Sequence, residues 1–186
     1  MAATGSNTVA NVSTTKGVAG GYFFSAPSTA TVPTDYSTAL GSDFVNLGFI
    51  SEDGVTESIE TDAETLVDMN GDAVFTASSS RTETITMTLI EVKEAALKEI
   101  YGHDMVTATT SLITVRHGSH TASERIYVLE LVLRDGRRWR QVAPAGQVTE
   151  VGEMSLASGE LAGREITITC NVDATGVSVY DYIEAE

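Results

Sequence analysis

The sequence has a single cysteine, Cys170, which excludes an internal disulfide framework and any zinc site built from several cysteines. No stretch approaches the roughly 18 consecutive apolar residues that a membrane-spanning helix requires, so no association with a membrane is expected. The chain opens on Met-Ala-Ala-Thr-Gly, without the apolar segment of a secretory signal. These absences together predict a soluble protein made inside a cell.

Positive charge is also scarce. The chain carries 11 Lys and Arg residues against 26 Asp and Glu residues, for a net charge of -15, and no basic residue lies between Lys16 and Arg81. Because binding to nucleic-acid phosphates requires Lys and Arg, this balance argues against a nucleic-acid-binding protein. It suits a surface that repels nucleic acid, and equally a negative surface that only keeps the protein in solution.

Motifs that would carry catalysis are missing as well. The sequence contains no nucleophile elbow, phosphate loop, dinucleotide fingerprint or zinc-binding helix, so we expect neither an enzyme nor a cofactor. A pair of carboxylates brought together only by the fold is the one arrangement that this reasoning leaves open.

Two patterns resemble metal sites and fail on their details. Asp68-Met-Asn-Gly-Asp72 places oxygen ligands at the first, third and fifth positions of a calcium loop, but Ala73 and Ser79 stand where a glycine and a bidentate Glu are required. A turn held by an Asp side chain is the better interpretation. The histidines (His103, His117 and His120) are more typical of exposed turns than of a metal cluster, because the Gly-Ser turn does not align the last two imidazoles.

What the sequence does contain is characteristic of β structure. It has few aromatic residues, many threonines and 16 glycines. Alternation and turn signals predict strands at about 44–50, 55–59, 81–89, 109–116, 125–133, 138–142, 148–156, 165–172 and 177–183. Residues 90–101 switch to helical spacing and stop at Gly102. We therefore expect a mainly β protein, a β-sandwich or half-barrel with one flanking helix.

The alternation also separates core from surface. One face of the strand at 81–89 carries Ile85, Met87 and Leu89, and one face of the strand at 165–172 carries Ile166, Ile168, Cys170 and Val172. We expect these side chains to be buried, with Cys170 as a small core residue and not a nucleophile.

Residues 1–42 have a different composition, with Lys16 and Asp35 as their only charged residues. We expect them to form an extended arm before a single domain at 43–186, and the aromatic run Tyr22-Phe-Phe24 to be buried against the body or a neighbour. Ser51-Glu-Asp-Gly54 predicts a hairpin turn, followed by a long acidic loop, so that residues 51–80 form one acidic connection.

Opposite charges are concentrated in two separate segments. The acidic residues of the loop are Glu52, Asp53, Glu57, Glu60, Asp62, Glu64, Asp68 and Asp72, and the basic residues of a later hairpin are Arg125, Arg134, Arg137, Arg138 and Arg140. The second group, which surrounds Trp139, could bind nucleic acid or pair within its own sheet. We favour a contact between the two groups on different subunits, a heterologous arrangement that closes into rings or propagates as a filament.

Two segments near the start of the chain resemble the start of major tail tube proteins of long-tailed, siphovirus-type DNA phages. The first is residues 20–35, which contain Ala-Pro, then small residues, then Pro-Thr-Asp. The second is residues 47–55, Leu-Gly-Phe-Ile-Ser-Glu-Asp-Gly-Val. The resemblance implies a β-sandwich whose strands contribute to a shared inner barrel, and six-subunit rings stacked into a hollow tube. It places the protein in the virion tail after synthesis in the host cytoplasm. Its expected partners are further copies of itself, a tape-measure protein, a tail terminator and distal tail proteins, with DNA passing through unbound.

Two further groups are expected to have roles in such a tube. The arm contacts between subunits are expected at Tyr22, Phe23, Phe24, Pro27 and Pro33. The polar lining of the tube is expected at Thr84, Thr86, Thr88, Glu165, Thr167, Thr169, Asn171 and Asp173, although both faces could equally be the outer surface. The alternative function is a monomeric β-sandwich recognition module that binds carbohydrate or mediates adhesion. That alternative requires clustered exposed aromatics, whereas the sequence has one tryptophan and scattered tyrosines.

Overall fold

The computed structural model describes residues 8–154 and 156–185. Its helical elements are a short 3-10 turn at Val9–Asn11 and one α-helix, α1 (Glu94–Tyr101). Its strands are β1 (Thr15–Gly17), β2 (Phe23–Pro27), β3 (Val45–Asn46), β4 (Ile50–Val67), β5 (Ala73–Leu89), β6 (Val106–Ala108), β7 (Ile113–Val115), β8 (Arg125–Leu133), β9 (Arg138–Val151), β10 (Arg164–Asn171) and β11 (Tyr180–Ile183). The prediction of a mainly β fold with one helix is confirmed.

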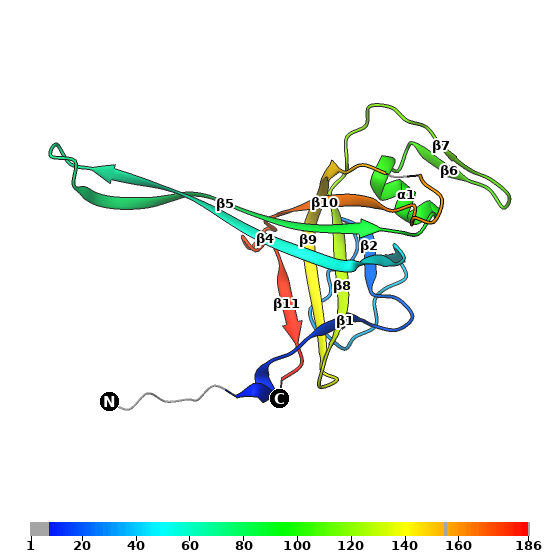
Figure 1. Cartoon of the computed structure of the whole chain (residues 1–186), viewed down its shortest axis with the longest axis horizontal. Coiled ribbons are helices and arrows are strands. Elements are labelled where there is room, and N and C mark those ends of the chain that lie inside the picture. Colours follow the sequence, from blue (N-terminus) through cyan, green and yellow to red (C-terminus); the bar gives the residue numbers. More distant parts are fainter. Residues whose placement is uncertain (1–7, 155, 186) are drawn as a thin grey trace.

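One antiparallel sheet runs in the order β3-β2-β8-β9-β10-β5-β4, with β1 added to β8 and β11 added to β9. β9 pairs with β11 through residues 139–142 and with β10 through residues 145–151, so its two halves have different neighbours. In Figure 1, β10, β5 and β4 cross the direction of β8 and β9 at a steep angle. The sheet therefore folds over on itself into a half-barrel.

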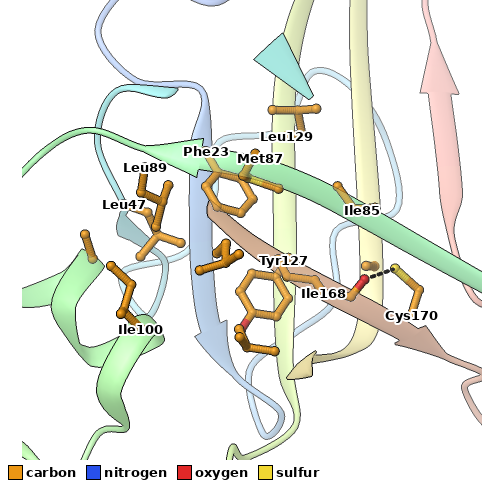
Figure 2. Packing of buried hydrophobic residues seen from close by; sticks show 14 residues of the cluster. Phe23, Leu47, Ile85, Met87, Leu89, Ile100, Tyr127, Leu129, Ile168 and Cys170 are labelled. Atoms are coloured by element: carbon orange, nitrogen blue, oxygen red, sulfur yellow. Dashed lines mark hydrogen bonds between the residues drawn. The ribbon is translucent and has the colours of Figure 1, made fainter. Parts of the chain in front are cut away.

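The main core lies inside this fold. Figure 2 shows Ile85 and Met87 of β5 and Ile168 of β10 facing Phe23, Tyr127 and Leu129 from β2 and β8. The predicted inward alternation along β5 and β10 is confirmed, and Cys170 is buried as expected. Val172 is an exception, with 65% of its surface exposed, because β10 ends at Asn171.

The expected N-terminal arm is largely part of the domain. β2 pairs with residues 125–129 of β8, and β1 pairs with residues 131–133 of the same strand. Ala26, Ile126, Val128 and Val142 form a second apolar cluster on the other face of the sheet, which Val32 and other residues of the 28–44 connection cover. The boundary at residue 42 is therefore wrong, because the segment supplies strands and a covering layer. The start of the expected arm, residues 1–7, lies outside the described residues.

The prediction of an acidic loop at residues 51–80 is also wrong, because most of these residues form strands. β4 and β5 form a long two-stranded hairpin that projects far beyond the rest of the sheet (Figure 1). Ser51-Glu-Asp-Gly54 is an irregularity within β4, between the paired residues Ile50 and Val55. The chain reverses instead at residues 68–72.

The helix is shorter than predicted. Residues 90–93 stay extended after β5, with the Ile90 amide donating to the Phe49 carbonyl, so α1 begins at Glu94. Val92 is consequently exposed, whereas Ala96 and Ile100 are buried as expected. Gly102 ends the helix with φ of 98°, a conformation that glycine adopts without steric cost.

Candidate assembly surfaces

The turn at the tip of the hairpin is built by one aspartate. Asp68 Oδ1 accepts hydrogen bonds from the backbone amides of Asn70 (2.8 Å) and Asp72 (2.9 Å), and Gly71 takes φ of 88°. These bonds lower the pKa of Asp68. The interpretation of this segment as an aspartate-held turn is confirmed, and the turn lets two long strands reverse at a narrow tip.

Apolar side chains on this hairpin point into solvent. Met69 at the apex is fully exposed, and the other exposed apolar residues are Ile59, Leu66, Val67, Val74 and Phe75. Leu66 and Phe75 are paired across the two strands, so all of these side chains except Ile59 lie at the end of the hairpin (residues 66–75, hereafter the tip). Monomeric soluble proteins rarely expose large contiguous apolar patches, which makes the tip a candidate contact surface.

The predicted acidic residues lie along the same hairpin. Glu52 and Asp53 are exposed in the β4 irregularity, and Glu60, Asp62 and Glu64 follow on the exposed part of that strand. Glu57 sits nearer the body, where Gln141 Nε2 donates to its Oε2 at 2.8 Å. Burial and the neighbouring Glu83 carboxylate raise the pKa of Glu57. The hairpin is therefore an acidic rod with an apolar end.

The predicted basic group is divided by the structure. Arg140 is buried on β9, with Nε donating to Glu130 Oε1 of β8 at 2.8 Å and Nη1 donating to the Asp35 carbonyl at 2.7 Å. Arg125 is buried beside Glu99 of α1. The expectation that these two arginines contact another subunit is wrong, because both are used inside their own domain.

The remaining three arginines lie at the turn between β8 and β9. Arg137 Nε bonds to Asp135 Oδ2 at 2.7 Å, which holds the turn that Asp135-Gly136 predicted. The Arg134 and Arg138 side chains are exposed on either side of it. This end of the sheet therefore carries exposed arginines together with the carboxylates of Asp135 and Glu184.

An open groove of about 270 Å³ lies next to that turn, between β1 and the base of β4. Its walls include Tyr22, Val55, Leu129, Leu131 and Trp139, and Lys16 stands at its edge. Trp139 is held in place because its Nε1 donates to Asp181 Oδ1 at 2.6 Å. We call this feature the β1 groove.

A polar face covers the outer side of β4, β5 and β10. Thr84, Thr86 and Thr88 of β5 lie directly opposite Thr169, Thr167 and Glu165 of β10, and opposite Ser58 and Thr56 of β4. The hydroxyls of Thr86 and Thr167 bond to each other at 3.1 Å, and Thr149 of β9 bonds Thr169 at 2.8 Å. The structure thus gathers the predicted threonines into one face of small hydroxyl side chains (the threonine face).

Asp173 does not belong to that face. Its carboxylate accepts hydrogen bonds from the hydroxyls of Thr175 and Tyr180, at 2.7 Å each, and from the Thr175 amide in the turn after β10. These bonds hold its pKa far below the usual range. Asn171, the last residue of β10, is exposed. The prediction that Asp173 continues the strand face is wrong, because the chain has already turned.

Of the arm residues, Phe23 is buried in the core of its own domain and Tyr22 Oη accepts from the Ile50 amide at 2.7 Å. Phe24 packs in the second apolar cluster. Pro27 ends β2 with an exposed ring, and Pro33 lies half-buried in the covering connection. Phe23 therefore cannot make the inter-subunit contact expected of it.

Sequence reasoning missed a buried polar cluster centred on Glu99. Ser25 Oγ and Tyr127 Oη donate to the two Glu99 oxygens, each at 2.7 Å, and His103 Nε2 lies 3.3 Å away. Burial would raise the pKa of Glu99, but these bonds and the Arg125 charge outweigh it and hold the pKa below its usual value. Residue 99 follows Ala96 by three positions on the buried stripe of the helix, which is the signal that could have found it.

The other two histidines contact residues other than Glu99. The rings of His117 and Tyr101 are in an edge-to-face arrangement with their centroids 4.6 Å apart, while His120 lies against Gly102. Within residues 8–154 and 156–185, no three potential metal ligands gather at one point. In the same part of the chain, no helix has the length and apolarity needed to cross a bilayer.

Together the fold and these surfaces define a structural β protein whose distinguishing feature is an exposed hairpin. The chain belongs to the phage tail tube protein family, whose sequence model matches residues 3–186. No curated protein matches it. This family membership establishes a structural role in the tail tube and does not support the alternative of a recognition module.

Two solved structures can be aligned with most of the chain. One is the tube-terminating cap of an anti-feeding prophage, with 14% identity, coverage of 92% of this chain and 93% of that chain, and a TM-score of 0.45. The other belongs to the extended sheath-tube complex of an extracellular contractile injection system, with 14% identity, 89% coverage of both chains and a TM-score of 0.43.

Proposed function

We propose that this protein is the major subunit of a siphovirus-type phage tail, in which six copies form a ring and the rings stack into a hollow tube. The observation that carries the proposal is the projecting hairpin, whose exposed apolar tip is explained by burial against another copy. Contact between a projecting element and a different surface of the next copy is heterologous, and heterologous contacts close into rings or extend as filaments.

The free edge of β4 supports the same assembly. β4 is the last strand of the sheet, so the side that faces away from β5 has no partner strand within the described residues. An exposed strand edge can be covered by backbone pairing with another chain, which would join neighbouring sheets into a continuous inner surface.

We propose the threonine face as the lining of that inner surface. Its side chains are mainly hydroxyls, with Glu165 as a charged member at one edge. Such a surface offers the phosphates of passing DNA hydration and no cation to hold them. DNA would then move through the tube without specific binding during ejection into the host, and the tape-measure, terminator and distal tail proteins would contact the lumen and the tube ends.

Electron microscopy of the purified chain, concentrated at moderate salt, tests the proposal. We expect rings with sixfold symmetry and hollow tubes, and we expect a variant with Met69→Ser and Phe75→Ser at the tip to remain unassembled while keeping the circular dichroism of the parent. Leu112→Ser, at the exposed tip of the β6–β7 hairpin, is the matched control and should assemble normally. Tubes of normal length from the tip variant would contradict the role given to the hairpin.

A further inference from the structure

We infer that the β1 groove of one copy is the receptor for the hairpin tip of another copy. The inference rests on the proposed self-assembly and names the two surfaces that meet. The tip is the convex partner, with an exposed methionine at its apex, and the groove is a concave surface with an apolar wall. Methionine is flexible and fills irregular apolar gaps, which makes it well suited to such a contact.

The sizes of the two surfaces match. The groove has a volume of about 270 Å³, whereas an apolar cavity of about 150 Å³ is enough to hold a benzene molecule. There is room for the Met69 side chain together with part of Phe75 or Val67. The groove offers Leu129, Leu131 and the Trp139 ring as its apolar partners.

The charges around the two surfaces are complementary. The tip contains Asp68 and Asp72 and follows Glu64, and no Lys or Arg occurs anywhere between positions 16 and 81. On the β1 side the groove is lined by Lys16, whose strand pairs with the end of β8, and the exposed Arg134 lies in the adjoining turn. On the β4 side, the exposed Glu52 and Asp53 lie between the lining residues Ser51 and Gly54. The charge complementarity is therefore confined to the β1 side of the groove, from which we expect the acidic tip to approach.

Among the described residues, the groove lining includes one carboxylate, that of Glu57. Gln141 Nε2 donates to it, and Glu83, Asp181 and Arg81 lie around the same stem of the hairpin. Glu57 therefore already has a partner in Gln141, and it lies on the β4 side of the groove, whereas Lys16 lies on the β1 side.

A copy cannot fill its own groove. Val55 lines the groove, and Val67 at the far end of β4 lies 12 strand residues further along the hairpin, which corresponds to about 40 Å of extended chain, with Met69 beyond it in the turn. The paired strands of the hairpin keep that distance open, as Figure 1 shows. Any contact between the tip and the groove must therefore join two molecules.

Disulfide trapping between two single-cysteine variants tests this assignment. Met69→Cys is mixed with Thr15→Cys, which lies on the groove wall, and oxidised at the concentration used for assembly. The native Cys170 is buried and its pKa is raised to about 12, so it does not compete. We expect a cross-linked dimer that contains one copy of each variant.

Two controls and a charge variant make the outcome specific. Met69→Cys mixed with Leu112→Cys pairs the tip with an equally exposed position elsewhere and should give at least tenfold less dimer. Adding Lys16→Glu to the Thr15→Cys chain should reduce the trapped dimer several-fold, and the loss should be larger at low salt. Fluorescence of Trp139, the single tryptophan, should shift to shorter wavelength as the groove fills.

The possible results separate this inference from the proposed function. The docking is overturned, and the tube function left intact, by either of two results. One is tubes without a disulfide between cysteines at positions 69 and 15, and the other is an equal yield of the disulfide between positions 69 and 112. A sample with neither tubes nor the link, even at millimolar concentration, counts against both. The link together with a Trp139 shift supports the docking.

Discussion

Glu99 of α1 and Arg125 of β8 form an ion pair inside the domain, with Oε1 and Nε 3.0 Å apart. The ion pair thereby connects the helix to β8, the strand with which the N-terminal strands β1 and β2 pair. Ser25 of β2 joins the same carboxylate, so three elements that are distant in sequence meet at one buried charge. The cluster fixes the body from which the hairpin projects.

Removing the Glu99 charge should destabilise the protein. Glu99→Gln leaves the buried Arg125 without its counter-charge, and breaking a buried ion pair on one side costs about 3–5 kcal/mol. The measurement is the free energy of unfolding from urea titration followed by circular dichroism. Glu94→Gln, which removes only the more exposed helix pair with Lys98, should cost well under 1 kcal/mol, as surface pairs do. Equal losses from both changes would contradict the role of the cluster.

The same carboxylate predicts a dependence of stability on pH. Because the pKa of Glu99 is lower in the folded chain than in the unfolded chain, its contribution is fully present above the ordinary value of 4.5 and is lost as the pH falls through the folded value. The free energy of unfolding of the parent should therefore drop more steeply than that of Glu99→Gln below that pH. Parallel curves for the two proteins would count against the lowered pKa.

The core beneath the threonine face should be sensitive to truncation. Ile168 is fully buried on β10 between β5 and β9, and Ile→Ala changes at such sites cost about 2–5 kcal/mol. We expect Ile168→Ala to lower the free energy of unfolding by that amount. Thr167→Ala, the next residue on the opposite face, should cost far less, since it removes one partly exposed hydroxyl contact. The comparison uses urea titration of both variants.

Cys170 should be unreactive in the folded protein. Burial raises the pKa of its thiol to about 12, so the thiolate that reacts with maleimide is almost absent at neutral pH. Labelling in native buffer should be slower by at least a hundredfold than in denaturant, as measured by mass spectrometry. Fast native labelling would contradict the packing of β10 in Figure 2.

The side of the tube on which the threonine face lies can be measured with Thr167→Cys. In tubes, a lumenal cysteine should react with a small maleimide and be protected from one carrying a large polyethylene glycol chain. The unassembled variant is the control and should react with both. Equal reaction of the tubes with both reagents would place this face on the outer surface.

Parts of the fold could be predicted because their signals are local. Ile85, Met87 and Leu89 alternate with threonines on a half-buried strand, and Asp135-Gly136 marks a tight turn. The projecting hairpin has no buried face beyond Ile59, so its strands lack the alternation that would distinguish them from a loop. Its Ser51–Gly54 segment has the sequence of a turn, but in the structure this segment is an irregularity within β4, and β4 continues to pair with β5 beyond it.

Other features depend on partners that are far apart in sequence. Phe23 and Ser25 looked like parts of an arm because their neighbours Leu129 and Tyr127 lie about a hundred positions later. The pairing of Arg140 with Glu130 could have been found, since the two positions are equally distant from the turn at residue 135 and so face each other across β8 and β9. The composition of the arginine group suggested an exposed surface. Which of these arginines are buried depends on the register of the strands, which composition does not show.

The central claim is that the hairpin tip joins copies of this chain into a tube. The most direct test is electron microscopy of the parent protein and the Met69→Ser, Phe75→Ser variant at equal concentration, with sedimentation velocity on the same samples. We expect sixfold rings and hollow tubes for the parent and a folded monomer for the variant. Tubes from both proteins, or a monomer from both at millimolar concentration, would contradict it.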